Sequence, residues 1–165
     1  MKKLILSLLV AAFVGGNTLS AQTITKNEDG KYSLSVGHVT LTVDAQKGGK
    51  IVSYRYDDKE ILSQTKIPNS FGSTFWTSPQ SEWNWPPVPE YDTKPFNAEV
   101  AGDKLILTGE KSKRFGYRVR KELTTDKKDN AIVITYTIIN ESGETRKVAP
   151  WEISRVPNGG VLFFD

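Results

Sequence analysis

A short tryptophan-rich segment holds the side chains best suited to bind a ligand. Within residues 75–87 lie Trp76, Trp83 and Trp85, together with Gln80. An indole offers a flat apolar face that suits the C–H face of a sugar ring, and an amide can hydrogen-bond a hydroxyl. Interleaved prolines restrict the backbone, so the rings would be held before a ligand arrives. Alternatively, the tryptophans pack the loop onto the domain; we expect mixed use, with some rings packed and others exposed.

A second group of functional side chains stands near the C-terminus. If residues 148–156 form a strand, Trp151, Ile153 and Arg155 share one face and Glu152 points to the other. An indole can stack on a sugar while a guanidinium binds its oxygens, so we add Trp151, Glu152 and Arg155 to the predicted ligand-binding residues. Glu152 is also a weak candidate for a catalytic acid or base. The alternative is that Trp151 and Ile153 are core residues and Arg155 lies at the rim.

Other site chemistries have little support in the sequence. The chain has no cysteine and a single histidine, His38, which excludes disulfides and any metal site of the histidine–cysteine kind. The acidic stretches Asp57-Asp58 and 126–129 lack the alternating pattern of a calcium loop. We therefore predict no metal site and no cofactor.

The first residues predict export. Lys2 and Lys3 precede an apolar run over residues 4–14, and a polar stretch ends at the small residue Ala21. This is the order that a signal peptidase reads, so cleavage would leave Gln22 first. The run is shorter than the roughly 20 residues of a membrane-spanning helix, so no membrane insertion is predicted. We expect a signal peptide over 1–21 and a periplasmic or secreted product.

The charge of the mature chain is nearly balanced. Removal of Lys2 and Lys3 leaves 20 basic against 19 acidic residues, which gives no electrostatic case for a nucleic-acid partner. Lys111, Lys113 and Arg114 cluster at a predicted turn, where such residues usually form a solvated rim.

The elements that must position these residues are strands. Apolar and polar residues alternate from Tyr32 onward, and no segment shows a convincing period of 3.6. The class is all-β, and we predict an antiparallel β-sandwich. The predicted strands are 32–36, 39–43, 51–56, 60–62, 104–110, 115–123, 131–140, 148–156 and 161–164.

Two segments depart from this regular pattern. Residues 63–95 hold most of the prolines and little alternation, which predicts a long functional loop. Residues 161–164 begin an apolar strand just before the sequence stops at Asp165. Because such a strand would lack sheet partners, we expect residues 22–165 to be a single domain that is incomplete at its C-terminus.

These motifs together resemble the galactose mutarotase-like superfamily, and within it a family of exported bacterial proteins. The resemblance rests on residues 48–54, the tryptophan–proline loop, the strand 132–140 and the stretch Trp151 to Arg155. It implies a large β-sandwich, or supersandwich, with a concave sheet that binds carbohydrate. Members are usually nearly twice this long, which agrees with the expected truncation.

The resemblance favours sugar binding over catalysis. In true mutarotases two histidines and a glutamate move protons at the sugar, but the stretch Pro150 to Arg155 has no histidine. The glutamate base would lie beyond Asp165. We therefore expect a carbohydrate-binding protein. The alternatives are an aldose epimerase-like or other carbohydrate-active enzyme whose catalytic half is missing, and a module whose aromatic loop docks a protein.

Overall fold

The structure is a computed structural model that describes residues 24–65 and 71–159. The predicted signal peptide and the predicted strand 161–164 lie outside the described residues. The expected incompleteness of the domain therefore stays a prediction.

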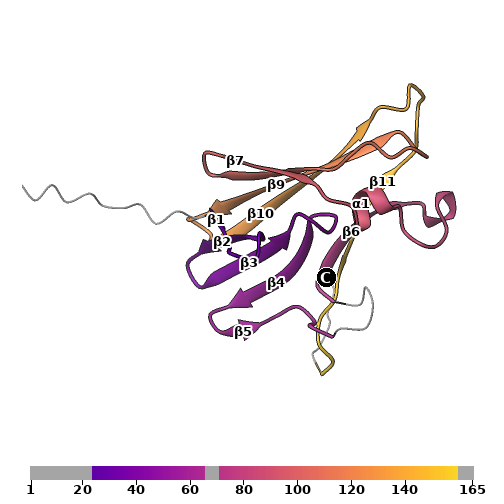
Figure 1. Ribbon diagram of the computed structural model, residues 1–165. Coiled ribbons are helices and arrows are strands. Elements are labelled where there is room, and N and C mark those ends of the chain that lie inside the picture. The colour runs from indigo at the N-terminus through magenta and orange to yellow at the C-terminus, as the bar shows by residue number, and fades with distance from the viewer. Residues whose placement is uncertain (1–23, 66–70, 160–165) are drawn as a thin grey trace, which may run out of the picture.

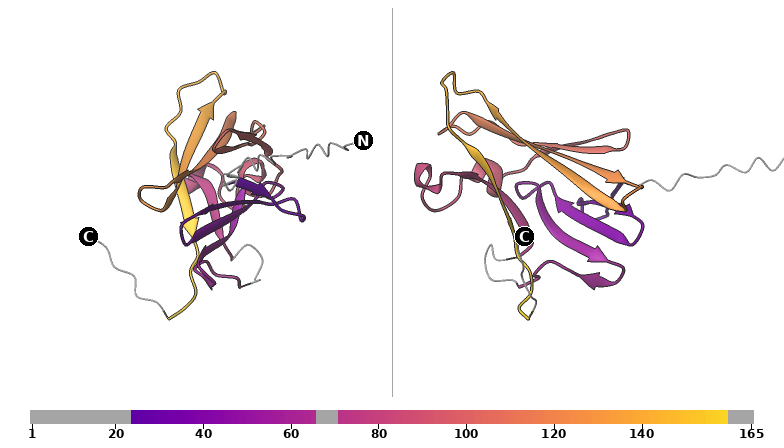
Figure 2. Two further views of the ribbon diagram at one scale, coloured as in Figure 1. Left: turned by 90° about the vertical axis from the view of Figure 1, so that its left-hand side faces the viewer. Right: turned by 180° about the vertical axis from the view of Figure 1, so that it is seen from behind.

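Two antiparallel sheets face each other, as Figure 1 shows from one side and Figure 2 from behind. The larger sheet has the order β1-β2-β3-β4-β6-β11, with β5 paired to β4, and the smaller has the order β10-β9-β8-β7. The strands of the larger sheet are β1 (Ile24–Lys26), β2 (Tyr32–Val36), β3 (Val39–Asp44), β4 (Lys50–Tyr56), β5 (Lys59–Glu60), β6 (Ser73–Ser78) and β11 (Ala149–Ser154). Those of the smaller are β7 (Asn97–Ala101), β8 (Lys104–Thr108), β9 (Tyr117–Asp126) and β10 (Ala131–Asn140). The predicted all-β sandwich is confirmed.

Alternation located most strands correctly, and β10 has the predicted bounds. The main error concerns residues 63–95, which contain strand β6 as well as the short helices η1 (Gln80–Glu82) and α1 (Pro89–Asp92). The first five residues of β6 are all buried, so both faces of the strand are covered and its sequence cannot alternate. The short strands β1 and β7 were also missed.

The core lies between the sheets and follows the period of the strands. In β9, Tyr117, Val119, Lys121 and Leu123 are all buried at every second position. Leu34 and Val43 of the larger sheet are likewise fully buried. The inward series of β9 therefore includes one charged side chain, that of Lys121.

Helix α1 packs against the turn between β3 and β4. Gly48 in that turn has a φ of 63°, and a Cβ there would lie 2.5 Å from the carbonyl oxygen of Asp92. Only glycine tolerates both the left-handed backbone and this close approach. The turn thus fixes the position of α1, whose last residue, Asp92, accepts a hydrogen bond from Trp76. Among the described residues, no helix is long and apolar enough to span a membrane.

Candidate functional site

Strands β6 and β11 divide the predicted site residues between two faces. Trp76 pairs with Trp151 and Phe75 pairs with Glu152 in the antiparallel register, so each pair shares one face. The ring of Phe75 stacks on Tyr136 of β10, 4.8 Å between centroids, which identifies its side as the inner face of the sandwich. Trp76 and Trp151 therefore lie on the outer face, and Glu152 lies on the inner one.

On the outer face, the four tryptophans form one cluster around Trp76. The ring of Trp76 meets those of Trp83, Trp85 and Trp151 edge-on, at centroid distances of 5.8, 5.8 and 5.6 Å. Trp83 also lies 6.4 Å from Trp151. Edge-to-face contacts at these distances are the favoured geometry for aromatic rings. We call Trp76, Trp83, Trp85 and Trp151 the tryptophan cluster.

Two members of the cluster are packed and have their polar atoms satisfied. Trp76 is 7% exposed and Trp83 is 3% exposed. The indole Nε1 of Trp76 donates to Oδ1 of Asp92 at 2.8 Å, and that of Trp83 donates to the carbonyl of Thr77 at 2.8 Å. Neither ring offers a free face to a ligand, so both act as supports.

The other two members reach the surface. Trp85 is 64% exposed, while Trp151 is partly buried. The backbone turns outward just before Trp85, because Asn84 adopts a φ of 54° and its N–H donates to the carbonyl of Gln80 at 2.7 Å. A shallow groove of about 460 Å³ lies beside Trp151 and also contains Gln80. The groove is lined by residues 78–81 and 149–151.

Arg155 directly follows β11, at the end of the strand that is farther from this groove. Its guanidinium carbon is 5.8 Å from the centre of the Trp76 ring, and Nη1 donates to Oγ1 of Thr74 at 3.2 Å. The side chain is partly buried and fixed by both contacts. Arg155 thus contacts the buried ring of Trp76 and not an exposed ring.

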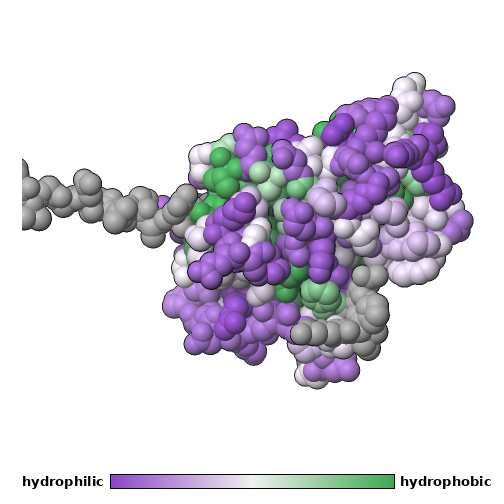
Figure 3. Space-filling view, viewed as in Figure 1, coloured by the Kyte–Doolittle hydropathy of each residue, from purple (hydrophilic) through white to green (hydrophobic). Residues whose placement is uncertain are grey.

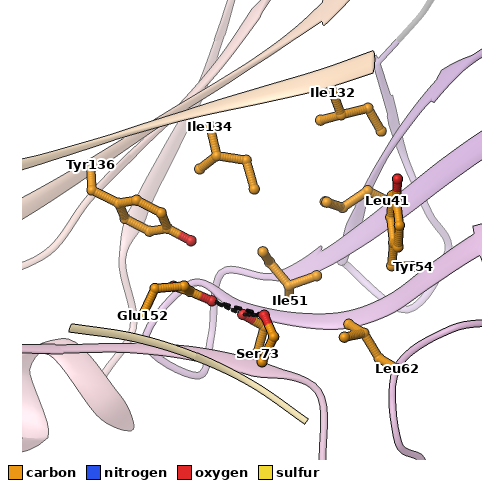
Figure 4. A pocket seen from close by; sticks show the side chains of 10 residues that line it. Leu41, Ile51, Tyr54, Leu62, Ser73, Ile132, Ile134, Tyr136 and Glu152 are labelled. Atoms are coloured by element: carbon orange, nitrogen blue, oxygen red, sulfur yellow. Dashed lines mark hydrogen bonds between the residues drawn. The ribbon is translucent and has the colours of Figure 1, made fainter. Parts of the chain in front are cut away.

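Glu152 lies in a different place, at a pocket of about 270 Å³ between the sheets (Figure 4). Its carboxylate accepts a hydrogen bond from the hydroxyl of Ser73, and Figure 4 shows the Tyr136 hydroxyl pointing toward the same space. Burial of the carboxyl raises the pKa of Glu152 above its ordinary value, although Tyr136 and Lys121 act in the opposite direction. Apolar side chains of Leu41, Ile51, Tyr54, Leu62, Ile132 and Ile134 line the rest of the pocket.

Lys121 is the buried charge behind this pocket. Its Nζ donates to the carbonyls of Gly48 and Gly49 at 2.8 and 2.9 Å, so it ties β9 to the turn that supports α1. Burial lowers the pKa of Lys121 to about 8, against the opposing influence of the charges on Glu152 and Asp92.

The structure brings together most of the predicted site residues. Five of them gather on the outer face, namely Trp76, Trp83, Trp85, Trp151 and Arg155, and Gln80 shares a groove with Trp151. Glu152 is separated from them by the sheet itself. Within residues 24–65 and 71–159, no three histidine or acidic side chains gather as metal ligands would.

Sequence reasoning missed three residues that matter here. Asp92 anchors Trp76, and the only local signal was the Pro89 that begins its short helix. Lys121 occupies an inward-facing position of an alternating strand, so the alternation itself indicates that this lysine is buried. Arg114 is exposed, as expected for a solvated rim, but its guanidinium also donates to the carbonyls of Glu82 and Trp83 at 2.7 and 3.5 Å, which the sequence did not indicate.

Comparisons with known proteins identify no family for this chain. No protein-family model matches the chain, and no curated protein matches it. Among solved structures, the chain is similar to the 4-alpha-glucanotransferase from Thermococcus litoralis, with a TM-score of 0.44 and 15% identity. The similarity covers 69% of this chain and 23% of that enzyme. A likeness of this size carries no conclusion about fold or activity, and the resemblance to the galactose mutarotase-like superfamily stays a prediction.

Proposed function

We propose that the protein binds carbohydrate on a surface formed by Trp85, Trp151 and Gln80, which we call the indole platform. The observation that carries the proposal is the exposure of Trp85. The residue is 64% exposed, yet its ring lies edge-on to the buried ring of Trp76, 5.8 Å between centroids. A large aromatic side chain held in this way presents an apolar face to water, and stacking on the C–H face of a sugar would remove that face from solvent.

The support beneath the platform is rigid. Trp76 is anchored by Asp92 and Trp83 by the carbonyl of Thr77, both at 2.8 Å. The guanidinium of Arg114 holds the backbone at Glu82 and Trp83 through their carbonyl groups. Because these contacts exist before a ligand arrives, little conformational entropy remains to be lost on binding.

The polar groups beside the rings match the edge of a sugar. The groove next to Trp151 holds the amide of Gln80 and the hydroxyls of Ser78 and Ser81. Amides and hydroxyls both donate and accept hydrogen bonds, as sugar hydroxyls do. An apolar surface with a few such groups at its margin is typical of binding sites for ligands that have one apolar and one polar side.

Glu152 supports the rival enzyme less well. Its raised pKa suits a general acid, which is the observation in its favour. However, the described residues that line its pocket include no second carboxyl group and no histidine that could act as its partner in acid–base catalysis. The geometry therefore favours binding at the platform over acid–base catalysis at Glu152.

Replacement of Trp85 by Ala tests the proposal. We expect affinity for the bound sugar to fall by about 1–3 kcal/mol, the usual loss for an aromatic anchor, and stability to change by less than about 0.5 kcal/mol. Calorimetric titration of the full chain against neutral gluco-, xylo- and galacto-oligosaccharides measures the affinity, and thermal melts measure the stability. Tyr56→Ala is the matched control, because Tyr56 is an exposed aromatic residue on β4.

Two results would contradict the proposal: a parent protein that binds no oligosaccharide, neutral or charged, or a Trp85→Ala variant with unchanged affinity.

The proposed export has a test of its own. Mass spectrometry of protein recovered outside the cytoplasm should find Gln22 as the first residue, and a retained Met1 would count against export.

A further inference from the structure

A second pocket lies at the same end of the molecule as the indole platform. It has a volume of about 480 Å³ and lies between the β8–β9 and β10–β11 connections. Its lining consists of residues 111–116 together with Glu141, Ser142 and Arg146. Figure 3 shows a mainly hydrophilic surface over this end, next to a paler surface over the η1–α1 segment. We call this site the basic pocket.

The carboxylates at the basic pocket are already paired. Arg118 binds both oxygens of Glu141 at 3.0 and 3.4 Å, and this contact holds the pKa of Glu141 below its usual range. Glu144 is paired with Arg146 at 3.1 Å. Each of these two carboxylates thus already has an arginine as its hydrogen-bonded partner.

Three cations remain at the pocket after this pairing. Among the described residues, Lys111, Lys113 and Arg114 form no ion pair with a carboxylate. Arg114 donates only to neutral carbonyl groups. The basic pocket thus carries an uncompensated positive charge, and a concave site of this kind attracts anions.

The backbone of the basic pocket is well fixed. Within the β8–β9 connection, the N–H of Gly116 donates to the carbonyl of Ser112 at 2.9 Å, and the N–H of Ser112 donates to that of Tyr117 at 2.7 Å. Gly116 also packs tightly on the other connection, since a Cβ there would lie 2.6 Å from Cα of Ser142. The lysines therefore project from a rigid turn and not from a loose loop.

Arg114 joins the basic pocket to the indole platform. Its guanidinium lines the pocket and binds the carbonyls of Glu82 and Trp83. Trp85 is only two residues further, so its Cα lies at most about 7.6 Å from that of Trp83. One chain of linked sugars could thus stack on Trp85 and reach the pocket with a neighbouring unit.

We infer that the ligand of the indole platform is an anionic glycan, whose carboxylate or sulfate group binds in the basic pocket while a neighbouring sugar stacks on Trp85. This inference rests on the proposed function and specifies its substrate class. The platform supplies affinity for the sugar ring, and the three cations without an ion-pair partner select the charged unit.

Matched pairs of glycans test the inference, because their members differ in charge alone or nearly so. We choose oligogalacturonate against its methyl ester for the carboxylate, and sulfated against unmodified dextran oligosaccharide for the sulfate. At about 20 mM salt, the anionic member of at least one pair should bind about tenfold more tightly, and this preference should shrink as salt rises. The preferred pair identifies the anionic group.

The double variant Lys111→Ala/Lys113→Ala should remove most of the preference, because it lowers the affinity for the anionic member far more than that for the neutral member. Lys127→Ala/Lys128→Ala is the matched control. It removes the same charge at the β9–β10 turn, which lies at the opposite end of the ten-residue strand β9. This control should keep the preference.

The outcomes separate the inference from the proposed function. Equal binding of charged and neutral members in both pairs would overturn the inference and leave sugar binding intact. Binding of anionic members that survives Trp85→Ala would also overturn it, because the pocket would then recognise an ion and not a sugar on the platform. If no member of either pair binds, the inference fails, and the titrations against gluco-, xylo- and galacto-oligosaccharides then decide the proposed function separately.

Discussion

The polar groups on the two sides of the β6–β11 pair lie in different surroundings. On the outer face, the N–H groups of Trp76 and Trp83 bond to Asp92 and to a backbone carbonyl, and the rings pack around them. On the inner face, titratable groups such as Glu152 and Lys121 lie at or behind an apolar pocket, and burial shifts the pKa of each toward its neutral form.

We therefore expect ligand binding to depend on the outer face and the pH dependence of stability to depend on the inner face. The indole groups of the outer face do not ionise, so binding by stacking there should vary little with pH. The groups of the inner face are linked to folding, because their protonation differs between the native and unfolded chains. Substitutions of the exposed rings on the outer face should therefore change ligand affinity. Substitutions of the titratable groups on the inner face should change how stability depends on pH.

The largest effect is expected for Trp83→Ala. Trp83 is 3% exposed and touches both Trp76 and Trp151, so its removal leaves a cavity beneath the platform. We expect a loss of roughly 3–5 kcal/mol in the free energy of unfolding, measured by chemical denaturation. A loss no larger than that of Trp85→Ala would show that the two rings do not differ in role, and the distinction between supports and platform would fail.

A smaller and pH-dependent effect is expected for Lys121→Met. Between the native pKa of about 8 and the unfolded value of 10.5, the unfolded chain binds more protons, so the stability of the parent protein rises with pH. Relative to the variant, the parent should gain up to about 3 kcal/mol across this window. Below pH 8 the difference in stability between the parent and the variant should not change with pH. It also contains the cost of leaving the carbonyls of Gly48 and Gly49 without their donor.

Denaturation of both proteins at intervals from pH 7 to 10.5 measures this effect. Parallel curves for the parent and Lys121→Met across the whole range would mean that Lys121 keeps its proton in the native state throughout. The charge on the inner face would then not be linked to stability in this range.

The smallest effect is expected for Glu152→Gln. Because burial raises the native pKa, the native chain binds more protons than the unfolded chain just above the ordinary pKa of glutamate, and stability falls as pH rises through that window. The variant should lack this slope and keep the parent's affinity for glycans. Denaturation at acidic pH and titration at neutral pH test both points. Mutarotation of aldoses above the buffer rate, lost in this variant, would instead favour the enzyme.

The sequence predicted the alternating elements well and the tryptophan site only in outline. The half-buried strand β10 could be located because its alternation is local. Strand β6 could not be, since a strand covered on both faces shows no alternation. The partition between packed Trp83 and exposed Trp85 depends on the backbone conformation of Asn84 and on a distant arginine, which no local pattern encodes.

The pairing of β6 with β11 also has a consequence for folding kinetics. Ser73 and Ser154 are register partners although 81 positions separate them along the chain. Contacts of such long range close a large loop, which costs entropy that local hairpins do not, and they are typical of slow steps in all-β proteins. Trp151 reaches Trp76 only when this pair forms, so the platform should be completed late, after the hairpins β2–β3 and β9–β10. A chain that has emerged only as far as β10, from a ribosome or from an export channel, therefore lacks the complete platform.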